Sequence, residues 1–65
     1  MENKDELKEF LLKEIEENES LAEKWAQKRY ETKDVFSNEY IASCQMENYF
    51  SGKEMAYREL YLLLK

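Results

Sequence analysis

The sequence contains no histidine and no proline, and it has one glycine and one cysteine among its 65 residues. With no histidine, and with Cys44 as the only thiol, the Cys/His zinc sites and an internal disulfide are excluded. A single thiol fits a reducing compartment. A nucleophilic Cys44 would need a neighbouring base, so we expect a small, buried, unreactive side chain instead.

The shortage of turn-forming residues excludes most β-rich folds. Hairpin turns depend on Gly, Asn-Gly or Pro, and this chain has only Gly52. A glycine-rich phosphate-binding loop is excluded for the same reason. Glu, Lys, Leu and Ala, which favour helices, dominate the composition. The sequence therefore predicts an all-α protein with a single domain over residues 1–65.

Long apolar runs are also missing. The longest, Leu60 to Leu64, is far below the ~18 residues that cross a bilayer. The first residues are acidic, unlike a signal peptide, and no lipidation motif is visible. We therefore expect a cytoplasmic protein with no membrane partner. The formal net charge of −5 makes nucleic acid an unfavourable partner.

The first helix is predicted to begin at Asn3, whose side chain forms a capping box with Glu6. Ser20 and Glu23 form a second such pattern, so a break near residues 18–20 is the alternative to one long helix. The expected apolar face repeats at helical spacing. Its members are Leu7, Leu11, Ile15, Asn18, Ala22 and Trp25.

A second long helix is predicted over residues 37–64, after a turn at residues 32–37 rich in Thr, Asp and Ser. Two helices of similar length joined by one short turn indicate an antiparallel hairpin. Ser51 and Glu54 could begin a new helix at Gly52, but heptad phase continues across the glycine. This favours one continuous helix.

Two apolar stripes run along the second helix at heptad spacing, about 100° apart. The first stripe consists of Ala42, Met46, Tyr49, Lys53, Ala56, Leu60 and Leu63. The second stripe consists of Phe36, Tyr40, Ser43, Glu47, Phe50, Glu54, Tyr57, Tyr61 and Leu64.

A two-helix hairpin cannot bury both stripes. We expect the first stripe to pack within the hairpin and the second to meet a second copy in a four-helix-bundle dimer, or another protein. Tyrosine rings suit such a surface because they bury well and keep a polar edge. The candidate interface residues are Phe36, Tyr40, Phe50, Tyr57, Tyr61 and Leu64.

Side chains that could carry chemistry are sparse. Glu14, Glu16, Glu17 and Glu19 follow the polar face of a helix, where solvated carboxylates are expected. No metal-binding motif, cofactor site or catalytic constellation is present, so we do not expect an enzyme. One basic patch is a candidate site for an anionic partner or for the chain's own acids: Lys24, Lys28, Arg29 and Lys33.

Residues 49–57, followed by Leu60, read aromatic–x–x–Gly–Lys–x–x–Ala–Tyr–x–x–aliphatic when the pattern starts at Tyr49. This pattern is similar to helical segments in small uncharacterised proteins of phages and mobile elements. The resemblance implies helical packing and such a genomic setting. It transfers no activity and no functional residue.

These features favour a non-enzymatic protein that acts by protein–protein association, as a regulator or inhibitor. One alternative is an acidic inhibitor that imitates nucleic acid through residues 2–19. Another is a small dimeric DNA-binding regulator with residues 20–33 as a separate recognition helix. The partner, the biological process, and the choice between homodimer and heteromeric subunit stay open.

Overall fold

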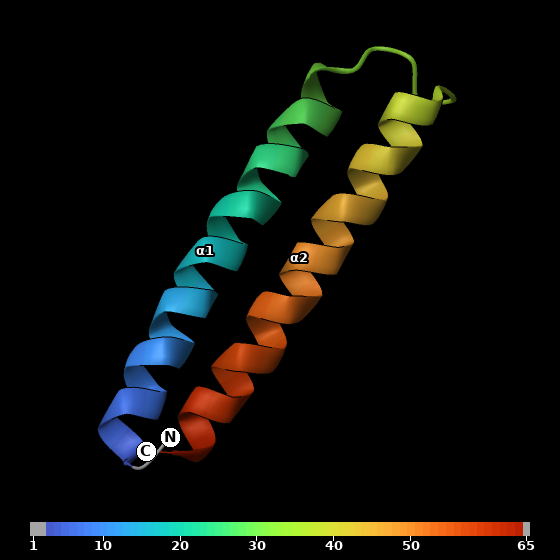
Figure 1. Cartoon of the computed structure of the whole chain (residues 1–65). Coiled ribbons are helices and arrows are strands. Elements are labelled where there is room, and N and C mark those ends of the chain that lie inside the picture. Colours follow the sequence, from blue (N-terminus) through green and yellow to red (C-terminus); the bar gives the residue numbers. More distant parts are fainter. Residues whose placement is uncertain (1–2, 65) are drawn as a thin grey trace.

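Two helices lie side by side in opposite directions in the computed structural model, which describes residues 3–64 (Figure 1). Helix α1 spans Lys4–Glu31 and helix α2 spans Asn38–Leu63. The hairpin measures 48 × 16 × 14 Å. The predicted all-α antiparallel hairpin is confirmed.

Helix α1 begins where the capping box predicts. The Asn3 side-chain oxygen accepts a hydrogen bond from the Glu6 backbone N–H at 2.8 Å. The alternative break near residues 18–20 does not occur, because α1 continues unbroken through this stretch. Its buried polar residue, Asn18, is satisfied within the helix, since Nδ2 donates to the Glu14 carbonyl at 2.7 Å.

The turn at residues 32–37 is organised by Asp34. Its carboxylate accepts from the Phe36 N–H at 3.0 Å, and its carbonyl accepts from the Ser37 hydroxyl at 2.7 Å. The Ser37 oxygen in turn accepts from the Tyr40 N–H at 3.1 Å and caps α2. The predicted turn is therefore confirmed.

Helix α2 runs through Gly52 without a break, as heptad phase indicates. A Cβ placed on this glycine would meet no atom within 4 Å. No close approach inside the hairpin therefore requires a glycine here.

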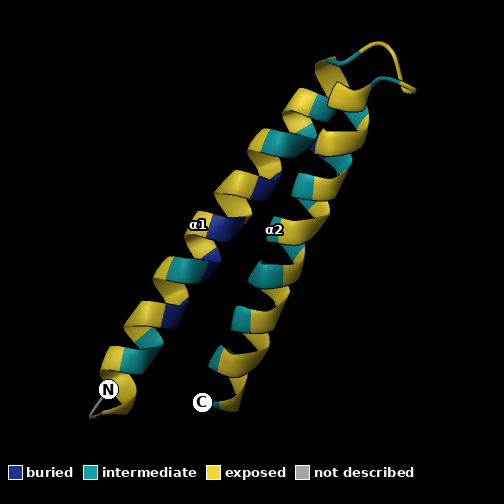
Figure 2. Ribbon diagram, turned by 45° about the vertical axis from the view of Figure 1, so that its right-hand side comes forward, coloured by how far each residue is buried: buried dark blue, intermediate teal, exposed yellow. Residues whose placement is uncertain are grey.

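The fully buried residues of the described chain lie in the seam between the helices (Figure 2). The hydrophobic ones are Leu11, Ile15 and Ala22, and they are joined by Asn18 and Ser43. Three buried hydrophobic side chains make a small core. Small domains bury a smaller fraction of their surface than large ones, so each buried side chain matters more to their stability.

The stripe that packs on α1 is the second one, which reverses our expectation. Its members from Tyr40 to Leu64 are all buried or half-buried, whereas most of the first stripe is exposed. The cause lies in α1, which offers Arg29 to the polar member Glu47 and presents Phe10 to Tyr57. Of the polar members of the second stripe, Glu47 thus finds a partner across the seam, and Glu54 pairs with Arg58 of its own helix.

Candidate functional site

Tyr57 and Arg58 contact α1 on opposite sides of the seam. The Tyr57 ring meets Phe10 edge-on, with ring centroids 6.4 Å apart. The Arg58 guanidinium donates to Glu19 at 3.1 Å. Successive helical residues are about 100° apart, so these side chains flank the line along which α2 faces α1. We call the Tyr57 side the apolar flank and the Arg58 side the polar flank.

The apolar flank follows from helical spacing around Phe10 on α1 and Tyr57 on α2. It contains four large apolar side chains that the hairpin leaves exposed: Phe10, Leu21, Tyr49 at 57% exposure and Leu60 at 49%. Its apolar members are Leu7, Phe10, Leu21 and Trp25 on α1, and Ala42, Met46, Tyr49, Phe50, Ala56, Tyr57, Leu60 and Leu64 on α2; Lys28 and Lys53 lie among them.

Two lysines of this flank cover aromatic rings. The Lys28 ammonium lies 5.0 Å from the centre of the Trp25 ring, and the Lys53 ammonium lies 5.3 Å from that of Tyr49. Tyr49 also packs edge-on against Phe50, at 5.1 Å between centroids. A cation–π contact thus holds each ammonium group against the flank, which carries these two positive charges.

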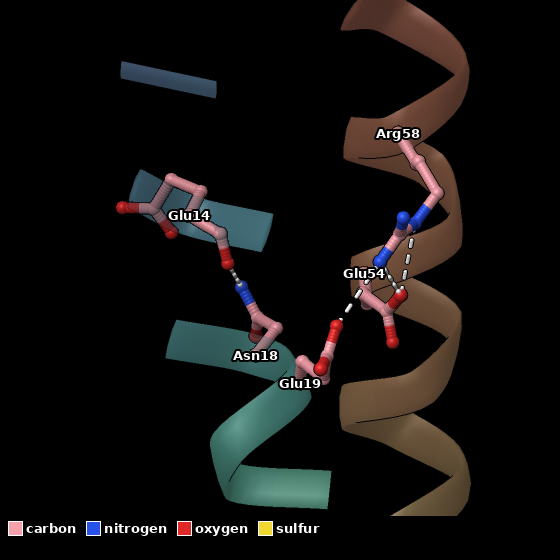
Figure 3. A network of polar contacts seen from close by, with 5 residues as sticks. All are labelled: Glu14, Asn18, Glu19, Glu54 and Arg58. Atoms are coloured by element: carbon pink, nitrogen blue, oxygen red, sulfur yellow. Dashed lines mark hydrogen bonds and ion pairs between the residues drawn. The ribbon is translucent and has the colours of Figure 1, made fainter. Parts of the chain in front are cut away.

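The polar flank carries an ion network that joins the helices. Arg58 bonds both Glu54, one turn away on α2, and Glu19 on α1 (Figure 3). Hydrogen bonding to Glu54 raises the pKa of Arg58 above its ordinary value. Exposed pairs of this kind add little stability. Of the two pairs, Arg58–Glu19 is the one that joins α2 to α1.

Two members of the predicted basic patch make different contacts in the structure. Arg29 is turned into the seam, where its Nε donates to Glu47 at 2.8 Å. That hydrogen bond raises the pKa of Arg29 above its ordinary value, so its charge is retained and already compensated. Lys28, the preceding residue, lies over Trp25 instead.

Five of the six predicted interface residues line the α1-facing side of α2. They are half-buried rather than free: Tyr40, Phe50, Tyr57, Tyr61 and Leu64. The sixth, Phe36, lies in the turn and is 88% exposed. An interface role for this set stays a prediction. The sequence places Tyr49 and Leu60 in the first stripe and predicts that they pack within the hairpin, whereas the structure leaves both exposed.

Other kinds of site find no support in the described part of the chain. Residues 3–64 contain no group of three His, Cys, Asp or Glu side chains arranged to hold a metal, and no pocket. Cys44 is half-buried. Neither α1 nor α2 has an apolar stretch of the length that a bilayer crossing requires. No family model, curated protein or solved structure matches the chain.

Proposed function

We propose that the protein acts without catalysis, by protein–protein association through the apolar flank. Its first partner is a second copy of the same chain, and the two hairpins form a four-helix bundle. The observation that carries this proposal is an uncovered apolar flank on a hairpin whose described residues include only three fully buried hydrophobic side chains. Small scaffolds with so few buried groups usually need another stabilising device, and oligomerisation is one.

The surface area of the hairpin supports a second copy. A compact monomer of 7.9 kDa exposes about 4,400 Å². The hairpin exposes 5229 Å², so the excess is about 800 Å², close to what each partner contributes to a standard protein interface. The radius of gyration is 14.8 Å, against about 11 Å for a compact domain of this length.

Two substitutions of the same residue type test the flank. Leu60 is 49% exposed on the apolar flank, and Leu62 is 60% exposed, two residues and about 200° further around α2. We expect Leu60→Glu to dissociate the dimer, because it places a carboxylate in the proposed interface. The matched control, Leu62→Glu, should leave the mass unchanged. The measurement is absolute mass by light scattering after size exclusion.

Equal behaviour of the two variants would contradict the proposal. If both remain dimers, the apolar flank is not the interface. If both dissociate, a new carboxylate on either flank disrupts the dimer, and the apolar flank is not specifically the interface. Circular dichroism of each variant shows whether the helices persist.

A dimer of this kind would act on a further protein as a regulator or inhibitor, in the phage or mobile-element setting that the resemblance of residues 49–60 implies. The polar flanks then remain available to that protein. Each carries exposed acids such as Glu16 and Glu23. Pull-down with the dimer and with Leu60→Glu would show whether the assembled state is the one that binds.

The two alternative functions make different structural demands on α1. The DNA-binding regulator requires residues 20–33 as a separate helix, and α1 is continuous there. The acidic imitator of nucleic acid rests on the acids of residues 2–19, of which Glu2 lies outside the described residues. Binding by such an acidic surface would weaken steeply with added salt, whereas apolar association would not. Measuring the affinity for the target protein in 50 mM and in 500 mM salt distinguishes the acidic inhibitor from apolar association.

A further inference from the structure

We infer how the second copy lies in the dimer proposed above. Helix α2 packs against the partner's α2 in the opposite direction, about a two-fold axis beside residue 51. The inference rests on that proposed dimer and deepens it. It concerns the first stripe, which the structure leaves outward on the apolar flank.

Large and small side chains of the first stripe match those of a second copy only when the two α2 helices run antiparallel. Antiparallel pairing brings together positions equally far before and after the axis. Ala42 then meets the partner's Leu60, and Met46 meets the partner's Ala56. Large residues thus lie opposite small ones, which is how helices interdigitate without voids. Parallel pairing would place leucine on leucine and alanine on alanine.

Lys53, the only charged member of the first stripe, supports the same direction. It is half-buried, with its ammonium over the ring of its own Tyr49. Antiparallel pairing places it beside the partner's Tyr49 as well, so each ammonium lies between aromatic rings. Parallel pairing would bring the two lysines face to face, and their like charges would repel each other.

The exposure of apolar side chains near both ends of α2 supports this arrangement. Phe36 in the turn is 88% exposed, and Leu63 at the far end of α2 is 82% exposed. Nothing within the hairpin covers either side chain to more than a small extent. With the axis beside residue 51, position 39 lies opposite the partner's Leu63, and Phe36 comes three residues before that position. One arrangement therefore shields both ends.

Disulfide cross-linking between two differently tagged chains tests the arrangement. Both chains carry Cys44→Ser; one also has Ala42→Cys and the other Leu60→Cys. Mixing and mild oxidation should link the two differently tagged chains to each other as the main product, because a disulfide needs Cα atoms within about 7 Å. The control pair, Ala42→Cys with Leu62→Cys, places the second thiol on the polar flank and should link at least tenfold less.

The outcomes separate this inference from the proposed function, since the mass of each mixture is measured before oxidation. A dimer that does not form the mixed link, or that links like chains equally well, overturns the antiparallel arrangement and leaves the proposed dimer intact. A wild-type chain that is monomeric overturns both. A second pair, Met46→Cys with Ala56→Cys, gives an independent reading if truncating Leu60 weakens association.

Discussion

Ser43 is the most deeply buried polar side chain of the described hairpin, at 1% exposure, and its hydroxyl has no hydrogen-bond partner. A buried, unpaired hydroxyl costs free energy that an apolar group would not. We predict that Ser43→Ala raises the free energy of unfolding by about 1 kcal/mol, from removal of the hydroxyl and from the better helix propensity of alanine. Chemical denaturation measures the change.

Ser20→Ala is the matched control for this prediction, because Ser20 is exposed in the middle of α1. It should show only the helix-propensity gain, about half as large. A destabilised Ser43→Ala, or equal gains at the two sites, would show that the buried hydroxyl is not an unsatisfied group.

Gly52 gives a second prediction at the scale of one residue. It lies inside α2 with open space where a Cβ would be. Gly52→Ala should therefore raise the free energy of unfolding by about 1 kcal/mol, since glycine is a poor helix former. Ala56→Gly, one turn further on and also exposed, should lower it by a similar amount. A loss of stability in Gly52→Ala would mean that another helix approaches the glycine closely.

At the scale of the element, the two stripes of α2 have different tasks. Tyr57 packs on Phe10 within the hairpin, whereas Tyr49 is 57% exposed on the first stripe. Tyr57→Glu should therefore unfold part of the hairpin, at a cost of about 2 kcal/mol for the lost ring burial. Tyr49→Glu should dissociate the dimer with smaller loss of helix. Circular dichroism and light scattering on both variants measure the two effects separately.

If Tyr57→Glu kept its full helical signal and lost association while Tyr49→Glu remained a dimer, the second stripe would be the interface. That was the arrangement expected from the sequence alone, and the comparison of these two tyrosines decides between the two rotations of α2.

The sequence predicts where these elements begin and end better than how they face each other. Caps are local, so the pairing of Asn3 with Glu6 is visible in a short stretch of chain. The rotation of α2 is not local. Two stripes offset by one residue are about 100° apart, and the choice between them depends on Phe10 and Arg29 of the other helix.

At the scale of the whole molecule, twelve large hydrophobic side chains of the described hairpin are exposed, whereas three hydrophobic side chains are buried. The candidate site could be predicted from the sequence only as a second apolar stripe that one hairpin cannot cover. The sequence does not indicate which stripe faces outward. The contacts of Tyr57 and Arg58 with α1 in the structure identify it.

Absolute mass by light scattering after size exclusion, over a hundredfold dilution of the wild-type chain, tests the central claim most directly. The account predicts a species of about twice the 7.9 kDa chain mass that dissociates only at the lowest concentrations, since the chain's own buried core is small. A mass of one chain at every concentration would contradict it.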